Sequence, residues 1–224
     1  MRQLFAIGDI HGEYDKLIDL LAQIEAMRID HEPQTIVFLG DYVDRGPKSM
    51  QVIDHLMDGS HHSGDVWICL KGNHEDMMID WHSGGPSEYG HWAINGGVQT
   101  LDSYGGMYDD VPKSHIDWMR SLPFYHETEN HIFVHGGFMP YVELENQTEN
   151  VCMWIRNRFL DAPMGQGFEG WKHIVHGHTP VDGPDIRSWR TNLDTGACFG
   201  DRPLTAALFD RDKPGTPVSI LQAK

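Results

Sequence analysis

Basic residues are scarce in this chain of 224 residues. It carries 17 Lys and Arg against 33 Asp and Glu, so its formal net charge is −16 when the histidines are neutral. A broad nucleic-acid-binding surface needs clustered Lys and Arg, so we expect no nucleic-acid partner. The charge does not exclude phosphate substrates, because bound divalent cations would dominate the field at a local site.

Long apolar runs and cysteines are scarce as well. No run reaches the roughly 18 apolar residues that a transmembrane helix needs, so we expect no membrane partner. The N-terminal residues MRQ lead directly into a strand pattern, and no signal peptide is visible. The cysteines Cys69, Cys152 and Cys198 are odd in number and scattered, and Cys69 lies inside a strand pattern, which favours a buried free thiol there. Together these absences predict a cytoplasmic protein.

Internal repeats, low-complexity tracts and linkers are also missing. The length and an apolar fraction of 40% predict a single α/β domain over residues 1–224. The element pattern alternates strand-like segments at 2–8, 35–39 and 65–70 with helical periodicity at 13–27, 47–57 and 75–81. This β-α-β-α-β order predicts a parallel core with right-handed crossovers.

The second half of the chain has weaker patterns. Residues 82–112 are rich in glycine, and we expect short helices and loops there that lie over the active face. A helix is predicted around residues 114–121. Segments 186–195, 203–210 and 216–221 have strand-like patterns, and we expect them to form an antiparallel second sheet.

What the sequence does contain is a set of apolar, strand-like segments that each run into glycine together with Asp, Asn or His. The five motifs are Gly8-Asp9-Ile10-His11-Gly12, Gly40-Asp41-Tyr42-Val43-Asp44-Arg45-Gly46, Gly72-Asn73-His74-Glu75, Val134-His135-Gly136-Gly137 and Val175-His176-Gly177-His178-Thr179. In open α/β sheets, ligands bind at the carboxyl ends of the strands. Asp, Asn and His are metal-binding residue types, and glycine lets the backbone turn sharply. One motif alone could be a tight turn with a solvated ion pair, but five together indicate a metal site.

The spacing of these residues suits two metal ions. Asp9 and His11 lie two positions apart, so at an extended strand end both point to one side and can bind one cation. Asp41 could complete that site and bridge to a second cation, held by Asn73, His135 and one of the last histidines. These ligand types suit Mn²⁺, Fe or Zn²⁺ better than Ca²⁺. Two cations ~3.5–4 Å apart acidify a bridging water and clamp a phosphoryl group.

In their order and spacing, the motifs resemble those of the phosphoprotein phosphatase family within the calcineurin-like metallophosphoesterases. The resemblance covers Phe5 to about Leu208 and is to the compact bacterial and phage serine/threonine protein phosphatases. It implies an α/β/β/α sandwich, with two mixed β-sheets flanked by helices and a dimetal site at the C-terminal edges of the strands. It implies two divalent ions, Mn²⁺ first and Fe or Zn²⁺ as alternatives. It assigns one ion to Asp9, His11 and Asp41, and the other to Asp41, Asn73, His135 and His178.

The same resemblance implies the catalytic residues. His74 is the family's general acid, oriented by Asp44, and Arg45 and Arg156 look like phosphate clamps. The chemistry agrees, because a serine alkoxide is a poor leaving group and a histidine near neutral pKa can protonate it. Planar guanidinium groups suit bidentate contacts with phosphate.

Two assignments depend on motif position. His178 follows Gly177, as the family's Gly-His pattern requires, whereas His176 would be a strand-end residue beside the site. Arg156 stands two residues after Trp154, as in the phage-type members, and Arg158 is the competing candidate.

Several other residues are expected to have structural roles only. We expect surface or loop positions for His61, His62, His82 and His91, and packing roles for Trp81, Trp92 and Trp118. Cys152 has no histidine or other base at a telling spacing, so a phosphatase with a cysteine nucleophile is not favoured.

The resulting functional hypothesis is a phosphomonoesterase that hydrolyses phosphoserine or phosphothreonine in proteins, by direct attack of a metal-bridging hydroxide. Its partner would be a phosphoprotein or phosphopeptide, and no obligatory regulatory subunit is evident. The alternative is a symmetrical bis(5′-nucleosyl)-tetraphosphatase on the same scaffold, but the motif forms around Asp44 and Glu75 favour the protein phosphatase. A nuclease disagrees with the net charge of −16, and a catalytically dead metal-binding module disagrees with the intact Asp9, Asp41 and His74.

Overall fold

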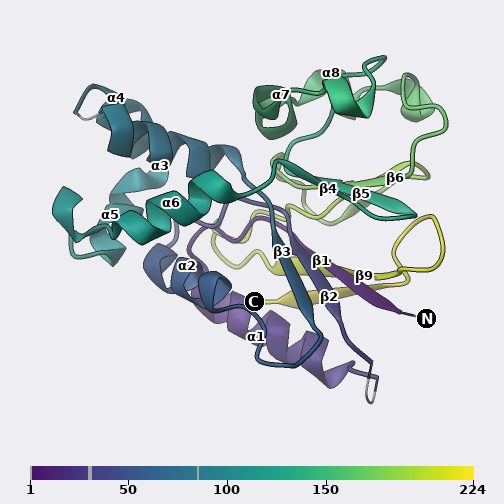
Figure 1. Ribbon diagram of the computed structural model, residues 1–224, viewed down its shortest axis with the longest axis horizontal. Coiled ribbons are helices and arrows are strands. Elements are labelled where there is room, and N and C mark those ends of the chain that lie inside the picture. Colours follow the sequence, from purple (N-terminus) through teal and green to yellow (C-terminus); the bar gives the residue numbers. More distant parts are fainter. Residues whose placement is uncertain (1, 30–31, 85) are drawn as a thin grey trace.

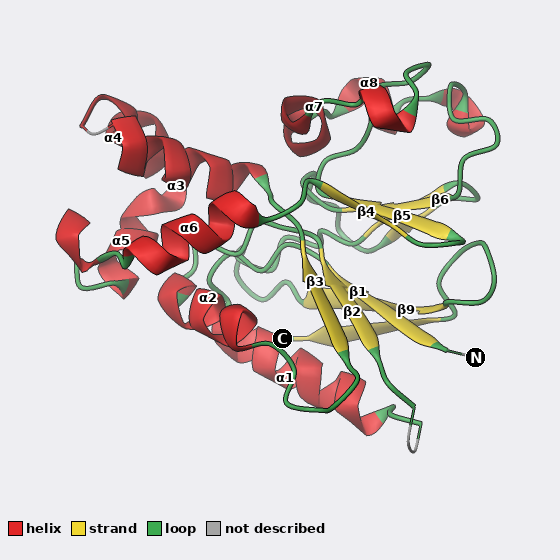
Figure 2. Cartoon of the chain, viewed as in Figure 1, coloured by secondary structure: helices red, strands yellow, loops and turns green. Residues whose placement is uncertain are grey.

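The computed structural model describes residues 2–29, 32–84 and 86–224, and its centre is a pair of stacked β-sheets. Figure 1 shows the two sheets face to face, with helices on the outer side of each. The layers therefore follow the α/β/β/α order that the sequence predicts, and Figure 2 shows the same layers by type of element. No helix of the described residues is long and apolar enough to cross a membrane.

The first sheet has the strand order β10-β9-β1-β2-β3. Its strands are β1 (Gln3–Ile7), β2 (Thr35–Phe38), β3 (Val66–Cys69), β9 (Leu204–Asp210) and β10 (Ser219–Ala223). β1, β2 and β3 run parallel, which confirms the predicted parallel core. β9 lies antiparallel to β1 on one side and to β10 on the other.

The position of β9 and β10 corrects the expectation that residues 203–210 and 216–221 join a second sheet. Both segments are antiparallel strands, but they extend the first sheet from β1. The first six residues of β9 are buried, because helices cover one face and the other sheet covers the second. A strand buried on both faces reads as a continuous apolar run, and such a run does not say which sheet receives it.

The second sheet has the order β4-β5-β6-β8-β7. Its strands are β4 (Tyr125–Glu127), β5 (His131–Val134), β6 (His173–His176), β7 (Asp185–Ile186) and β8 (Arg190–Asn192). β5, β6 and β8 are parallel to one another, and β4 and β7 are antiparallel edge strands. The segment predicted at 186–195 thus does belong to the second sheet, but that sheet is mixed.

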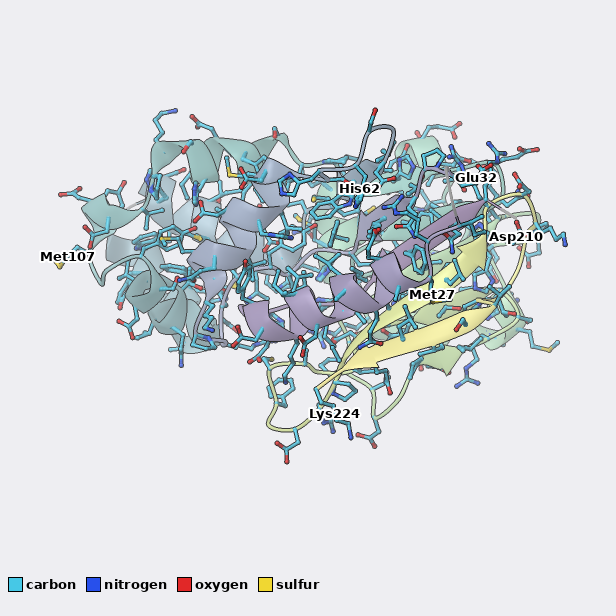
Figure 3. The ribbon with its side chains drawn as sticks, turned by 90° about the horizontal axis from the view of Figure 1, so that it is seen from below. Met27, Glu32, His62, Met107, Asp210 and Lys224 are labelled. Atoms are coloured by element: carbon cyan, nitrogen blue, oxygen red, sulfur yellow. The ribbon has the colours of Figure 1, made fainter. Side chains whose placement is uncertain are left out.

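Helices form both outer layers and a group beyond β3. α1 (Tyr14–Ala26) and α2 (Ser49–Asp58) cover the first sheet, and Figure 3 shows α1 running across it. The buried residues Leu17, Leu20 and Ile24 of α1 recur at helical spacing, so one stripe of the helix packs on the sheet. α7 (Glu149–Trp154) and α8 (Asn157–Leu160) cover the second sheet.

The helical group beyond β3 contains α3 (Asn73–Gly84), α4 (Pro86–Trp92), a π-helical turn (Ala93–Gly97), α5 (Val98–Ser103) and α6 (Lys113–Ser121). Short helices in the glycine-rich region 82–112 agree with the expectation from the sequence. Met107, at the tip of this group, lies at the opposite end of the molecule from Asp210 (Figure 3).

The apolar core has three layers because the strand residues alternate between faces. In β1, Leu4 and Ala6 point into the cluster between the sheets, while Phe5 and Ile7 point into the cluster under the helices. Phe133 enters the layer between the sheets from the second sheet. Apolar contacts in this layer hold the two sheets together, and the ends of their parallel strands meet along one edge.

Candidate metal centre

The predicted site residues lie where parallel strands of both sheets end. In the first sheet, Asp9 and His11 follow β1, Asp41 follows β2, and Asn73 follows β3 as the first residue of α3. From the second sheet, His135 and His178 follow β5 and β6. Each of these six side chains is buried, and none is more than 3% exposed. The structure thus brings together residues that are up to 169 positions apart in the chain.

The backbone of these loops adopts conformations that side chains usually avoid. Among the described residues, seven that are not glycine have positive φ, and five of them belong to the predicted site: His11, Asp41, Asp44, Arg45 and His178. Such conformations persist only where surrounding contacts enforce them, and they concentrate at functional sites.

Two motif glycines allow the backbone to approach the carboxylates. A Cβ atom at Gly72 would lie 2.2 Å from Oδ1 of Asp41, and one at Gly177 would lie 2.1 Å from Oδ1 of Asp9. Any side chain at these positions would displace the carboxylate, so the glycines are required by close contact.

Asp41 lies between two groups of possible metal ligands. Its Oδ2 is 3.6 Å from Nε2 of His11 and 3.9 Å from Nε2 of His74. Its Oδ1 is 3.3 Å from Nε2 of His135, which in turn lies 3.2 Å from Nδ1 of His178. The two groups are therefore His11, Asp41 and His74, and Asp41, His135 and His178. One carboxylate oxygen faces each group, which is the geometry that a bridging ligand needs.

Asn73 and Asp9 complete the surroundings in different ways. Oδ1 of Asn73 lies 3.0 Å from Nε2 of His135, inside the second group. Asp9 accepts hydrogen bonds from the backbone N–H of His178 at 3.2 and 3.1 Å, and it belongs to neither three-residue group. Burial raises its pKa well above the usual value, and the charges of Asp194 and Asp41 add to this effect.

Backbone carbonyl groups hold one ring nitrogen of His11 and of His135, and the other ring nitrogen of each faces Asp41. Nδ1 of His11 lies 2.9 Å from the carbonyl oxygen of Val43, and Nδ1 of His135 lies 2.9 Å from that of Leu39. These bonds place the protons on Nδ1 and turn the Nε2 lone pairs toward Asp41. Nε2 of His178 is buried and has no hydrogen-bond partner among the described residues, so it is available to a bound group.

The charges also favour cation binding. Burial lowers the pKa of His178 to about 2, with the neighbouring His135 as the second cause, so its imidazole is neutral at pH 7. Burial opposes ionisation of Asp41, but His135 and His74 hold its pKa well below the usual value. Burial opposes the charged form of His135, but the carboxylate of Asp41 raises its pKa above the usual value. Imidazoles, carboxylates and an amide oxygen are a donor set that fits Mn²⁺, Fe or Zn²⁺.

His74 and Asp44 form a buried pair beside the first group. Nδ1 of His74 lies 2.6 Å from Oδ2 of Asp44, whose side chain is inaccessible to solvent. Burial lowers the pKa of His74 to about 4. Nη1 of Arg45 lies 2.6 Å from Nε2 of His11, and its Nη2 lies 2.9 Å from Nε2 of His74. The Arg45 guanidinium therefore contacts the first group, and it also lies 5.6 Å from the centre of the Phe199 ring.

The two competing arginines have different surroundings. The charge of Arg156 contributes to lowering the pKa of both His74 and His178, so this exposed side chain acts on the site. Nη1 of Arg158 instead lies 3.8 Å from Sδ of Met139. The ring of Trp154 stands 6.3 Å from that of His178, between the site and solvent.

His176 points to a different environment from His178. Its Nε2 lies 3.3 Å from Nη1 of Arg190, and its ring packs edge-on against Phe159 at 5.0 Å. Burial lowers its pKa to about 3, with the charge of Arg190 as the second cause. It is absent from both ligand groups.

Three residues that support the site were not identified from the sequence as doing so. Glu75 accepts hydrogen bonds from the backbone N–H groups of Asp41, Tyr42 and Gly72 at 2.9, 2.7 and 2.9 Å. Trp92 and Thr100 donate to Asp44. Glu75 had a signal, its place in the Gly-Asn-His-Glu motif, whereas the other two had none. Trp92, predicted as a packing residue, does stack on Trp81 at 4.3 Å but also donates this hydrogen bond.

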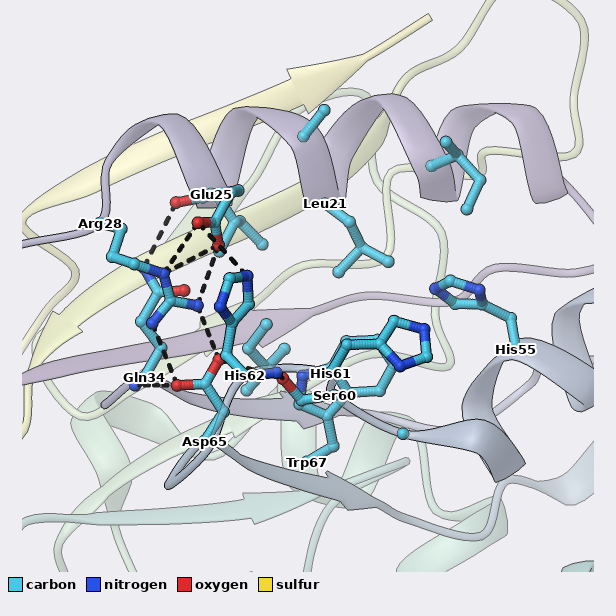
Figure 4. Close-up of a pocket in the computed structure, with 15 residues that line it drawn as sticks. Leu21, Glu25, Arg28, Gln34, His55, Ser60, His61, His62, Asp65 and Trp67 are labelled. Atoms are coloured by element: carbon cyan, nitrogen blue, oxygen red, sulfur yellow. Dashed lines mark hydrogen bonds and ion pairs between the residues drawn. The ribbon is translucent and has the colours of Figure 1, made fainter. Parts of the chain in front are cut away.

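Neither ligand group contains any of the histidines for which surface or loop positions were expected. His61 and His62 line a pocket of about 320 Å³ between α1 and the connection from α2 to β3 (Figure 4). Gln34 and Asp65, which precede β2 and β3, line the same pocket, so it lies at the end of the strands opposite the metal groups. Cys152 is buried, and burial raises its pKa to about 12, which disfavours a thiolate nucleophile at neutral pH.

Comparisons with known proteins agree with this geometry. Residues 3–212 match the model of the calcineurin-like phosphoesterase family. The chain is 28% identical to bis(5′-nucleosyl)-tetraphosphatase PrpE (asymmetrical) of Bacillus velezensis, with 91% of this chain and 87% of that protein covered. It is 26% identical to serine/threonine-protein phosphatase 1 of Salmonella typhimurium, with 92% and 91% covered.

Among solved structures, a putative diadenosine tetraphosphatase superposes with a TM-score of 0.70 at 20% identity, covering 99% of this chain and 94% of that chain. A protein serine/threonine phosphatase of Saccharomyces cerevisiae superposes with a TM-score of 0.64 at 14% identity, covering 99% and 78%. These likenesses support the fold. With the family match and the clustered His and Asp residues, they identify the chain as a metallophosphoesterase that belongs to the calcineurin-like phosphoesterase family.

Proposed function

We propose that this metallophosphoesterase hydrolyses phosphoserine or phosphothreonine in proteins. The observation that supports the proposal is the buried pair of His74 and Asp44, 2.6 Å apart, beside the ligand groups. A serine or threonine alkoxide is a poor leaving group that must be protonated as it departs. The leaving group of a phosphoanhydride is a good one and needs little protonation. A built-in proton donor therefore favours phosphomonoesters as substrates.

Two divalent ions would be held by the residues around Asp41. One would be bound by Asp9, His11 and Asp41, and the other by Asp41, Asn73, His135 and His178. When bound, such a pair lowers the pKa of a water molecule to make a nucleophile and neutralises charge on the phosphoryl group. We propose Mn²⁺ as the metal, with Fe or Zn²⁺ as alternatives, because the same donor set serves all three.

The two arginines would hold the phosphoryl oxygens. Arg45 donates to Nε2 of His11 and His74, and a metal on His11 would release one of these donors toward a phosphate. Arg156 approaches from α8, at the exposed side of the site. Guanidinium groups match phosphate in shape and charge, and they favour the crowded transition state most.

His74 would act as the acid once substrate is present. Burial lowers its pKa to about 4, so it is neutral at pH 7 without a ligand. A phosphate dianion next to Nε2 favours the imidazolium form, and the carboxylate of Asp44 at Nδ1 stabilises the same form. The proton on Nε2 can then pass to the departing alkoxide oxygen.

A second candidate is hydrolysis of dinucleoside tetraphosphates. It is favoured by the names of several relatives, which are asymmetrical bis(5′-nucleosyl)-tetraphosphatases, and by the putative diadenosine tetraphosphatase among the solved structures. The sequence-based alternative was the symmetrical activity, whereas these relatives carry the asymmetrical name. The match covers 91% of this chain and 87% of the relative from Bacillus velezensis, so it is not confined to a single motif.

We propose that residues 1–224 form one domain, that the protein is cytoplasmic, and that its partner is a phosphoprotein or phosphopeptide. We propose no obligatory regulatory subunit, no nucleic-acid partner and no membrane partner, in keeping with the net charge of −16.

The test is a comparison of two substrates with Mn²⁺-loaded protein at one pH and at low substrate concentration. We expect kcat/KM for a phosphothreonine or phosphoserine peptide to exceed that for diadenosine tetraphosphate by at least about tenfold, or roughly 1.4 kcal/mol in transition-state binding. The reverse ratio would move the assignment to the nucleotide. The products would then identify the cleavage, since ATP plus AMP indicates the asymmetrical reaction and two ADP the symmetrical one.

A further inference from the structure

Asp44, the carboxylate paired with His74, is enclosed by hydrogen-bond donors. Oγ1 of Thr100 donates to Oδ1 at 2.7 Å, and Nε1 of Trp92 lies 2.9 Å from Oδ1 and 3.1 Å from Oδ2. The backbone N–H of Asp44 donates to Oγ1 of Thr100 at 2.7 Å. All three side chains are fully buried. A carboxylate with no access to water needs such donors, because an unpaired buried charge is strongly unfavourable.

These donors fix the direction of the carboxylate. Oδ2 is the oxygen that faces Nδ1 of His74, while Oδ1 receives both Thr100 and Trp92. Rotating the carboxylate away from His74 would break these bonds. Asp44 therefore presents one oxygen to His74, and Thr100 and Trp92 keep it in that direction.

Both donors come from one short stretch, residues 92–100, in the helical group beyond β3. Trp92 ends α4, Thr100 lies in α5, and the π-helical turn between them brings both toward Asp44. The carbonyl oxygen of Gly96 in this turn accepts the backbone N–H of Arg45 at 3.1 Å. A Cβ atom at Gly97 would lie 2.3 Å from the Trp92 ring, so the turn also clamps the indole.

We propose that Trp92 and Thr100 are positioning residues for the general acid, acting on His74 through Asp44. The proposal rests on the proposed function, in which His74 protonates an alkoxide leaving group. It gives the helical group beyond β3 a specific role, because this group then holds the acid pair in place for substrates whose leaving group needs a proton.

The test uses substitutions that remove a hydrogen-bond donor, with the side-chain volume kept at Thr100 and a smaller aromatic ring introduced at Trp92. Thr100→Val removes the hydroxyl, Trp92→Phe removes the indole N–H, and the double variant removes both. Tyr104→Phe is the matched control, because it removes a buried hydroxyl of the same helical group that bonds to Nδ1 of His115 at 2.9 Å and not to Asp44. Thr100→Ser, which keeps the hydroxyl, should retain wild-type behaviour and excludes a simple packing effect.

The first readout is the dependence on the leaving group. We expect the double variant to lose about tenfold or more in kcat on a phosphothreonine peptide, as part of the ~10²–10⁴-fold typical of general acid catalysis. The loss on p-nitrophenyl phosphate, whose leaving group needs little protonation, should be only about twofold. The control variant should change neither value. Equal losses on both substrates would mean that the two residues serve folding only and would overturn the proposal.

The second readout does not depend on activity. In metal-free protein with ¹⁵N-labelled histidine rings, the Nδ1 proton of His74 is identified as the resonance that Asp44→Asn removes. We expect it to shift in the double variant and to stay in place in Tyr104→Phe. An unchanged resonance in the double variant would overturn the positioning role. If the wild-type protein preferred diadenosine tetraphosphate, the proposed function would fail, while this resonance would still decide whether Trp92 and Thr100 position the pair.

Discussion

Arg156 and Arg158 are two positions apart but have different electrostatic surroundings. Arg156 acts on the histidines of the site, whereas Arg158 lies near the sulfur of Met139. Both side chains are exposed, so neither is needed for the core. The pair therefore offers a comparison between two exposed arginines of equal charge, of which Arg156 acts on the histidines of the site and Arg158 contacts Met139.

We predict that Arg156→Ala weakens inhibition by free phosphate and lowers kcat/KM by about tenfold to a hundredfold, as loss of a charged hydrogen bond of roughly 1.5–3 kcal/mol would give. Arg158→Ala is the matched control and should stay within about twofold of the wild type. The measurement is the inhibition constant of inorganic phosphate in each variant. If only Arg158→Ala weakened inhibition, the assignment of the clamp would be reversed.

At the scale of single residues, residue type and spacing predict which side chains come together in the site. They do not predict the hydrogen bonds that hold these side chains in position. Asp9, Asp41, Asn73 and the histidines are recognisable because each follows a strand and glycine. Trp92 and Thr100 are not, because their partner Asp44 lies 48 and 56 positions away and no local pattern records that contact. The contact of Asp9 with the backbone of His178 could not be predicted either, because it joins loops that follow strands of different sheets.

At the scale of elements, Glu75 connects the loop after β2 to the start of α3. Its carboxylate receives the N–H groups of Asp41, Tyr42 and Gly72, and it is fully buried. The loop carries Asp41 and the helix carries Asn73, so the relative position of two predicted ligands depends on this side chain.

We predict that Glu75→Gln lowers both the free energy of unfolding and the affinity for metal. An amide NH₂ in place of one oxygen would face backbone donors, and loss of hydrogen bonds to a charged group amounts to about 1.5–3 kcal/mol. Denaturant unfolding and metal titration measure the two effects. Glu127→Gln is the control, because Glu127 pairs with Lys172 at the surface, where both side chains are about a third or more exposed, and such pairs contribute only about 0–1 kcal/mol. Equal effects of the two substitutions would contradict the role given to Glu75.

The elements themselves were predictable where the pattern is local. Alternation and helical spacing over the first 81 residues suffice for the parallel β-α-β-α-β core. The sheet to which β9 belongs could not be predicted in this way, because the pairing of β9 with β1 joins residues about 200 positions apart. An apolar run indicates that a strand is buried. Which strands pair with it is determined by the packing of the whole chain.

At the scale of the whole molecule, buried histidines make stability depend on pH. His173, at the start of β6, has its pKa lowered to about 4, chiefly by burial and secondly by the charge of His131. In the unfolded chain a histidine has a pKa near 6.5. Between these values the unfolded state binds a proton that the folded state does not, so this contribution to stability is lost as the pH falls from about 6.5 to about 4.

We predict that the free energy of unfolding of metal-free protein falls over this range, with up to about 1.4 kcal/mol per pH unit from His173. His173→Gln keeps a partner for Oγ1 of Thr191, which lies 2.9 Å from Nε2, and should reduce the slope. The exposed His61→Gln serves as the control and should leave it unchanged. Denaturant titrations at several pH values measure this dependence of the unfolding free energy on pH. The same slope in His173→Gln as in the wild type would refute the prediction.

The site draws on both sheets, and this has a consequence beyond turnover. Ions held jointly by Asp41 and His135 would form a cross-link between two layers that otherwise meet through apolar side chains. By mass action, metal at a hundred times its dissociation constant would add about 2.7 kcal/mol to the unfolding free energy. Proteases attack chains that open. In a cell short of metal, the protein would therefore be degraded faster as well as being less active, and its abundance would follow the metal supply.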